Sequence, residues 1–345
     1  MSAAGHARLG EALLVALFVA LPLSTAAQEI SLALALLYGL TQPARARLGH
    51  EPWGRAALAA AVVWILLAMM SGNLHEGLGH AWLLAPLVAI PAVLGDDDAA
   101  RARVERIGLL AAGVAAAWAI GQRALGGVGT AGLSHHLSLA YALLVPLGVA
   151  MATRRWGTAA VLAAGVLATG SEGAVVALGV TATAALSRRP LPALAIGTAT
   201  MLALLWLADA NELHERAILW TGGLTIAGGG AVGPGAYAAA SGPAYDTLSP
   251  GFWFPNHAHD SAIQLLAVLG PAGLVAMLGL ALLALRHGAV GPAAGLAGVL
   301  VGALTQDVLG DLEVARAAWA WLALYGGTRA ISGNPAAPLD TDPPC

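Results

Sequence analysis

The residues with the clearest chemical potential form the run Phe252-Trp-Phe-Pro-Asn-His257-Ala-His259-Asp260, which ends where an apolar segment begins. Asp260 or Ser261 is a suitable N-cap for a helix that starts there. His259 would then lie at a helix N-terminus, whose partial positive charge favours neutral imidazole and anionic ligands. Because a neutral imidazole can take a proton from a hydroxyl group, His259 is the candidate general base.

Metal binding is the alternative use for these histidines. His257, His259 and Asp260 carry side chains found in metal sites, but no other histidine cluster with a matching carboxylate is evident. Two further histidine pairs occur, His75 with His80 and His135 with His136. The residues of the first pair lie about 140° apart around a helix and so do not share a face. The adjacent histidines of the second pair are expected to have a positioning role instead of binding a metal. The sequence therefore predicts a site without a metal.

The composition determines the kind of molecule that must position these residues. The chain has 345 residues, of which 58% are hydrophobic and only 10% are charged, and its mean hydropathy is +0.76. Soluble domains have roughly 25% charged residues, so the sequence predicts an integral membrane protein. Abundant glycine and alanine suit close packing of helices in a membrane. The only cysteine is Cys345, which excludes an intramolecular disulfide.

Apolar segments long enough, or nearly long enough, to cross a bilayer recur about twelve times. They lie near 10–27, 29–41, 56–72, 79–95, 107–121, 136–152, 157–170, 173–187, 190–208, 261–285, 289–305 and 317–332. The predicted fold class is therefore an all-α integral membrane bundle that forms one domain over residues 1–332. One long loop, 209–260, interrupts it, and a proline-rich, disordered tail is expected at 333–345.

Arginine sets the expected orientation because the chain has no lysine. With residue 1 inside, most arginines fall on the inner side and residues 209–260 fall outside, the pattern of a bacterial inner membrane protein. Three arginines fall on the outer side: Arg123, Arg216 and Arg316. They are either loop charges and ion pairs, such as Arg216 with Glu212 or Arg316 with Glu313, or a clamp for an anion. Guanidinium binds phosphate bidentately and keeps its charge.

The long loop contains a glycine-rich stretch, Ala227–Tyr237, which lacks the Gly-Lys-Ser/Thr ending of a nucleotide-binding loop. This stretch and the residues on either side of it instead resemble the motifs of a known family. His259-Asp260, followed by nine residues, Gly270, two residues and Gly273, resembles the histidine motif of the O-antigen ligase and polymerase superfamily. Glu215-Arg216-Ala-Ile-Leu-Trp220 and Val232-Gly-Pro-Gly-Ala-Tyr237 are similar to the arginine, tryptophan and Gly-x-Gly signature that precedes that motif. Gln122-Arg123-Ala-Leu-Gly, with His135-His-Leu after it, resembles an upstream stretch.

Two positions depart from the family pattern. Asp260 stands where Asn, Ser or Gln is usual, and Ser171-Glu172-Gly173 stands at a tight outer hairpin where the family often has Ser-Arg-Gly. If that arginine holds phosphate in the family, either Arg123 or Arg316 takes its role here, or the activity differs.

The resemblance implies a GT-C-like membrane glycosyltransferase of the bacterial inner membrane. Such an enzyme transfers a glycan from undecaprenyl diphosphate to an acceptor sugar hydroxyl at the periplasmic face, without metal, nucleotide or other cofactor. His259 would take the proton of the acceptor hydroxyl, which attacks the anomeric carbon opposite the leaving diphosphate, with inversion. Arg216 and Arg123 would stabilise the charge on the diphosphate. Candidates for supporting roles are Asp260, His257, Arg316, Asp307 and Asp311.

The acceptor stays open at this stage. Lipid A–core as acceptor makes the protein a ligase, a second lipid-linked glycan makes it a polymerase, and protein O-glycosylation is a third variant. Membrane lipids are expected partners and nucleic acid is not. The alternative from another class is a transporter for lipid-linked glycans, which would be expected to carry mid-membrane charges and repeated halves with broken helices. Here the ionisable residues cluster at predicted helix ends, and no internal repeat is evident.

Overall fold

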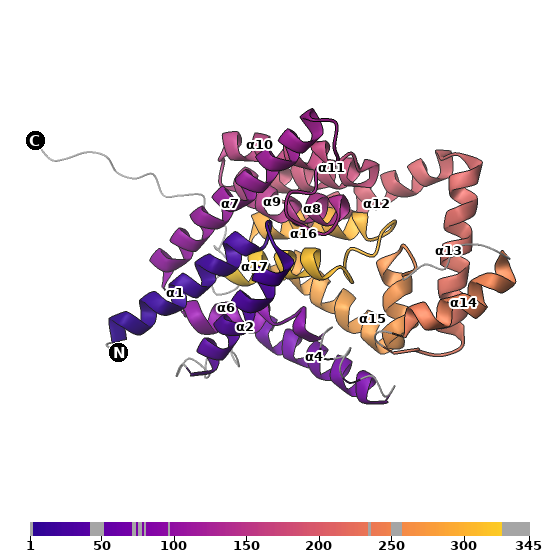
Figure 1. Cartoon of the computed structure of the whole chain (residues 1–345), viewed down its shortest axis with the longest axis horizontal. Coiled ribbons are helices and arrows are strands. Elements are labelled where there is room, and N and C mark those ends of the chain that lie inside the picture. Colours follow the sequence, from indigo (N-terminus) through magenta and orange to yellow (C-terminus); the bar gives the residue numbers. More distant parts are fainter. Residues whose placement is uncertain are drawn as a thin grey trace, which may run out of the picture.

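A computed structural model describes residues 3–41, 52–70, 74, 78, 81–95, 97–233, 236–249 and 257–325, and within these ranges the regular structure is helical throughout (Figure 1). The helices are α1 (Ala3–Ala20), α2 (Thr25–Thr41), α4 (Pro52–Met70), α6 (Pro86–Leu94), α7 (Asp98–Ala124), α8 (His136–Ala142), α9 (Leu144–Ala152), α10 (Trp156–Ala168), α11 (Glu172–Ser187), α12 (Pro190–Leu207), α13 (Ala210–Gly228), α14 (Tyr237–Leu248), α15 (Ser261–His287), α16 (Val290–Gly302) and α17 (Leu312–Tyr325).

Among the described residues, 3 helices are long and apolar enough to cross a membrane, namely α7, α12 and α15. Shorter apolar helices include α10, α11 and α16. With a rise of 1.5 Å per residue, the 16 residues of α11 span roughly 24 Å, somewhat less than a bilayer core of ~30 Å. The helices fit membrane association, whereas the number of crossings stays a prediction.

Each apolar segment marked in the sequence overlaps at least one described helix. Residues 209–260, however, differ from the long loop that we expected. They contain α13 and α14, which lie on one side of the molecule next to the start of α15 (Figure 1). The Asp209 side chain accepts a hydrogen bond from the Asn211 amide at 2.7 Å and begins α13. The predicted tail, 333–345, lies outside the described residues.

The interior is formed by closely packed helices with small side chains. α16 is buried along almost its whole length, against α9 and α11. At Gly295 a Cβ atom would lie 2.3 Å from the Cα of Val145 in α9. Only glycine permits such close contact between backbones, as expected from the small-residue composition for a protein in lipid.

A break in α15 fixes the direction of its first half. Gly270 has φ 69°, a left-handed conformation that favours glycine, and Pro271 follows it without a backbone N–H. The carbonyls of Ala267 and Val268, which lose their partners within the helix, accept the backbone amides of Val232 and Gly233 at 2.9 and 3.0 Å. The glycine-rich segment after α13 is thus joined to the break in α15.

Candidate functional site

The segment before α15 is held against the connection between α16 and α17, residues 303–311. The Ser261 amide donates to the Ala303 carbonyl at 2.9 Å. The Ser261 hydroxyl donates to the Gln306 carbonyl at 3.1 Å and accepts from the Leu309 amide at 3.1 Å. Asp260 caps the helix by accepting the Ile263 amide at 2.8 Å, so the predicted N-cap is confirmed.

His259 lies immediately before this cap, in a left-handed conformation with φ 55°. Its side chain is half-buried and forms a hydrogen bond with the side chain of Gln306. Burial, then His257, then the charge of Arg216 lower the pKa of His259 to about 4, while the bond with Gln306 acts in the opposite direction. The imidazole is therefore neutral at physiological pH, the form that a general base requires. Burial is the largest cause of this lowering.

Arg216 lines a cavity of about 420 Å³, here called the arginine cavity. The cavity lies where several helix ends meet. Its polar lining residues are His136, Ser171, Glu172, Glu212, Arg216, Thr305 and Gln306, together with Tyr141. Because Gln306 also bonds to His259, the candidate base is one hydrogen bond away from this cavity.

The Arg216 guanidinium has partners on two sides. Its Nη2 and Nε donate to Glu212 Oε1 at 2.9 and 3.1 Å, and its Nη1 donates to the Thr305 carbonyl at 3.2 Å. The ion pair with Glu212 that the sequence suggested is present. Arg216 also lines the cavity, and its role as a clamp for an anion stays a prediction.

The other two outer arginines lie elsewhere. Arg123 is exposed near the end of α7, and its guanidinium has no hydrogen bond or ion pair with the residues that the structure describes. Arg316 is 1% exposed and pairs with Glu29 of α2, instead of the Glu313 that we suggested. Neither lines the arginine cavity, which brings only Arg216 among the described arginines next to the segment of Ser171 and Glu172.

Two carboxylates suggested for supporting roles accept hydrogen bonds from backbone amides. Asp311 begins α17 by accepting the Glu313 amide at 2.8 Å, and it also accepts the Ser138 hydroxyl at 2.5 Å. Asp307 accepts the Gly310 amide at 3.1 Å within the α16–α17 connection. Burial raises the pKa of Asp307 to about 7, so this carboxyl is partly protonated near neutral pH.

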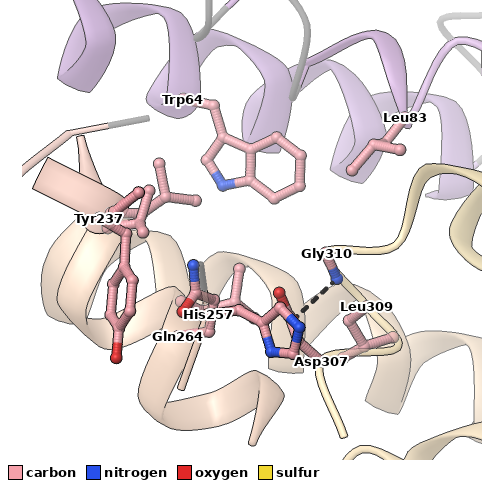
Figure 2. A pocket seen from close by; sticks show the side chains of 12 residues that line it. Trp64, Leu83, Tyr237, His257, Gln264, Asp307, Leu309 and Gly310 are labelled. Atoms are coloured by element: carbon pink, nitrogen blue, oxygen red, sulfur yellow. Dashed lines mark hydrogen bonds between the residues drawn. The ribbon is translucent and has the colours of Figure 1, made fainter. Parts of the chain in front are cut away.

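His257 and Asp307 line a second cavity of about 220 Å³, here called the tryptophan cavity (Figure 2). Its other polar lining residues are Trp64, Tyr237 and Gln264. The rings of His257 and His259 lie 4.2 Å apart between centroids. The candidate base thus lies close to two cavities with different linings.

Sequence reasoning missed Gln306 and Trp64. The only signal for Gln306 is that Thr305, Gln306 and Asp307 interrupt two apolar segments. Trp64 lies within an apolar helix, α4, so its pattern predicts only packing. The described residues contain no group of three or more His, Cys, Asp or Glu side chains that is placed to hold a metal ion. His75 and His80, and the aromatic residues Phe252 and Phe254, lie outside the described residues.

A scan against protein-family models and a search of curated proteins found no match for this chain. The likeness to the O-antigen ligase and polymerase superfamily therefore depends on the motif residues quoted above.

Proposed function

We propose that the protein is a membrane glycosyltransferase of the O-antigen ligase type. It transfers a glycan from undecaprenyl diphosphate to a sugar hydroxyl of lipid A–core at the periplasmic face of the bacterial inner membrane. One observation carries the proposal: a neutral, half-buried His259 is bonded to Gln306, which lines a cavity together with Arg216. A base beside a cavity that holds a guanidinium is the pair of groups that metal-independent glycosyl transfer from a diphosphate requires.

The residues have separate roles in the reaction. The acceptor O–H loses its proton to the His259 imidazole while its oxygen forms a bond with the anomeric carbon. The bond between that carbon and the diphosphate oxygen breaks on the opposite face, and undecaprenyl diphosphate leaves. Arg216 stabilises the charge on the leaving diphosphate. Because the acceptor attacks the face opposite the leaving group, the transfer inverts the anomeric carbon.

The Glu212 carboxylate occupies the hydrogen-bond donors of Arg216 that the diphosphate would use. Its side chain is 47% exposed, against 19% for Arg216. Pairs of this spacing that are open to solvent contribute only about 0.3–0.5 kcal/mol. A diphosphate with two negative groups can therefore displace Glu212 from the guanidinium at small cost.

Binding of the donor would also raise the pKa of His259. A pKa near 4 makes His259 a weak base, because general bases work best with a pKa close to the working pH. A diphosphate in the arginine cavity adds negative charge near the imidazole and neutralises the field of Arg216. Both changes raise the pKa of His259 toward its ordinary range, so the bound donor activates the base.

The test is a transfer assay with the purified full chain in proteoliposomes. Undecaprenyl-diphosphate-linked glycan is supplied alone or together with lipid A–core. We expect glycan on lipid A–core, and we expect the reaction to continue in EDTA. Longer lipid-linked chains from the donor alone would instead indicate a polymerase.

Two results would contradict the proposal. Movement of the donor across the bilayer without a new glycosidic bond would identify a transporter. Reversible loss of transfer in EDTA would mean that a metal takes part.

A further inference from the structure

Two buried polar atoms at the tryptophan cavity have no hydrogen-bond partner within the part of the chain that the structure describes. Trp64 is 0% exposed, and its indole Nε1 is buried without a hydrogen-bond partner among the described residues. The Nδ1 atom of His257 is in the same situation. In Figure 2 the indole nitrogen of Trp64 is directed toward the space between Tyr237 and His257. Buried polar groups are nearly always hydrogen-bonded, so these atoms indicate that the cavity receives a polar occupant.

The other lining residues determine the chemistry of that occupant. The Gln264 side-chain oxygen accepts the Ala258 amide at 2.9 Å, which leaves its amino group as a donor beside the cavity. Asp307 supplies acceptor oxygens, and Leu83, Leu265 and Leu309 supply apolar surface. Among the described lining residues there is no arginine, so the cavity does not suit a phosphate. Donors, acceptors and an apolar wall fit an uncharged polyhydroxyl compound.

The position of the cavity relates it to the base. Within the α16–α17 connection, Thr305 and Gln306 line the arginine cavity, whereas Asp307, Leu309 and Gly310 line the tryptophan cavity. His259 bonds to Gln306, and its ring lies 4.2 Å from that of His257 between centroids. An anion and an uncharged hydroxyl compound can therefore occupy separate cavities that both lie next to His259.

We propose that the tryptophan cavity binds the sugar ring of the acceptor, with Trp64 Nε1, the Gln264 amino group and Asp307 as its hydrogen-bonding groups. The role as acceptor site rests on the proposed function, whereas the binding of an uncharged sugar does not. A volume of about 220 Å³ is below the roughly 300–1,000 Å³ of sites for drug-sized ligands. One sugar ring is the part of a glycan that fits.

The test measures binding without turnover, in full-length protein that carries His259→Ala. The probes are dephosphorylated, deacylated core oligosaccharide from the source strain and undecaprenyl diphosphate. Ala238→Trp fills the cavity from an exposed lining position, and Ala239→Trp adds the same ring at an exposed neighbour outside the lining. Trp64→Phe keeps an aromatic ring and removes the N–H. Size-exclusion chromatography checks that each variant is folded.

We expect Ala238→Trp to weaken oligosaccharide binding at least tenfold relative to Ala239→Trp. Trp64→Phe should weaken it about threefold, the change expected for one lost hydrogen bond. Binding of undecaprenyl diphosphate should be the same in all three. Equal oligosaccharide binding by Ala238→Trp and Ala239→Trp would overturn the proposal, and so would a parent protein that does not bind the oligosaccharide. The cavity would then hold only water. Loss of undecaprenyl diphosphate binding in Ala238→Trp would overturn it as well, because the two cavities would then be one site. Oligosaccharide binding that depends on the cavity, together with no glycan transfer by the protein that retains His259, would refute the proposed enzyme activity and keep the sugar site.

Discussion

At the scale of single residues, the chemistry of His259 depends on its surroundings more than on its place in the motif. Burial, His257 and Arg216 lower the pKa of this imidazole to about 4. The group is neutral above that pKa and loses its function as a base only when it is protonated below it. Under the proposed function, two predictions follow, one for the free protein and one for the donor complex.

The rate at limiting donor, kcat/KM, reports the free enzyme and should stay level from pH 7 to about 5, then fall as the pH passes through 4. The acid limb of kcat, which reports the donor complex, should lie at higher pH, because the bound diphosphate raises the pKa of His259. A pH series of initial rates measures both. An acid limb of kcat/KM near 6.5, the ordinary pKa of imidazole, would contradict the lowered pKa of His259 in the free protein.

Arg216 is the second residue to which the proposed function gives a direct role. Arg216→Ala should raise the donor KM or lower kcat by at least about tenfold, since hydrogen bonds to charged groups contribute about 1.5–3 kcal/mol. Arg216→Lys should recover only part of this loss, because lysine cannot form the bidentate contact. Initial rates over a donor series give both constants.

Arg123→Ala is the comparison for Arg216. Arg123 lies outside the lining of the arginine cavity, so its removal should have a smaller effect than the removal of Arg216. A larger effect would place the upstream arginine at the diphosphate, as the family resemblance implies. Full activity of Arg216→Ala would reduce Arg216 to a partner of Glu212.

At the scale of elements, the break in α15 explains why the motif has glycine at position 270. A residue other than glycine in a left-handed conformation costs roughly 1–2 kcal/mol, and a Cβ at Gly270 would also lie 3.3 Å from that of Ala231. Gly270→Ala should therefore lower the melting temperature in detergent by about 2–4 °C or more. Gly279→Ala is the control, since it lies in the same helix with nothing within 4 Å of its added Cβ. Equal melting temperatures for the two variants would mean that the break does not depend on glycine.

Local signals explain which elements and contacts the sequence predicts. The cap of α15 by Asp260 and the pair of Arg216 with Glu212 involve residues within one turn, so their spacing is enough to predict them. The partner of Arg316 is Glu29, which lies on α2 and is distant in the chain, and no local pattern points to it. For the same reason sequence reasoning could not bring Trp64 to the side of His257, or join Val232 to the carbonyls that the break in α15 leaves free.

At the scale of the whole molecule, the candidate site lies where the ends of several helices meet. α11 begins and α12 ends beside the arginine cavity, and α13 starts there as well. The predicted topology puts these ends on the periplasmic side. Thr247 in α14 and Ala99 in α7 are exposed positions that fall on opposite sides in that topology.

Labelling with a membrane-impermeant maleimide tests this orientation in a Cys345→Ser background. In intact spheroplasts the reagent should modify Thr247→Cys and spare Ala99→Cys, and both should react after permeabilisation. The reverse pattern would place His259 on the cytoplasmic side and remove the basis for a periplasmic reaction.

The most direct measurement for the whole molecule is the transfer rate of His259→Ala in proteoliposomes that contain donor and lipid A–core. A general base typically contributes about 10²–10⁴-fold, so transfer should fall by at least about 10²-fold while undecaprenyl diphosphate still binds. His287→Ala, at the far end of the same helix, is the matched control and should transfer at the parent rate. Transfer by His259→Ala at a rate close to that of His287→Ala would contradict the central claim that His259 is the base.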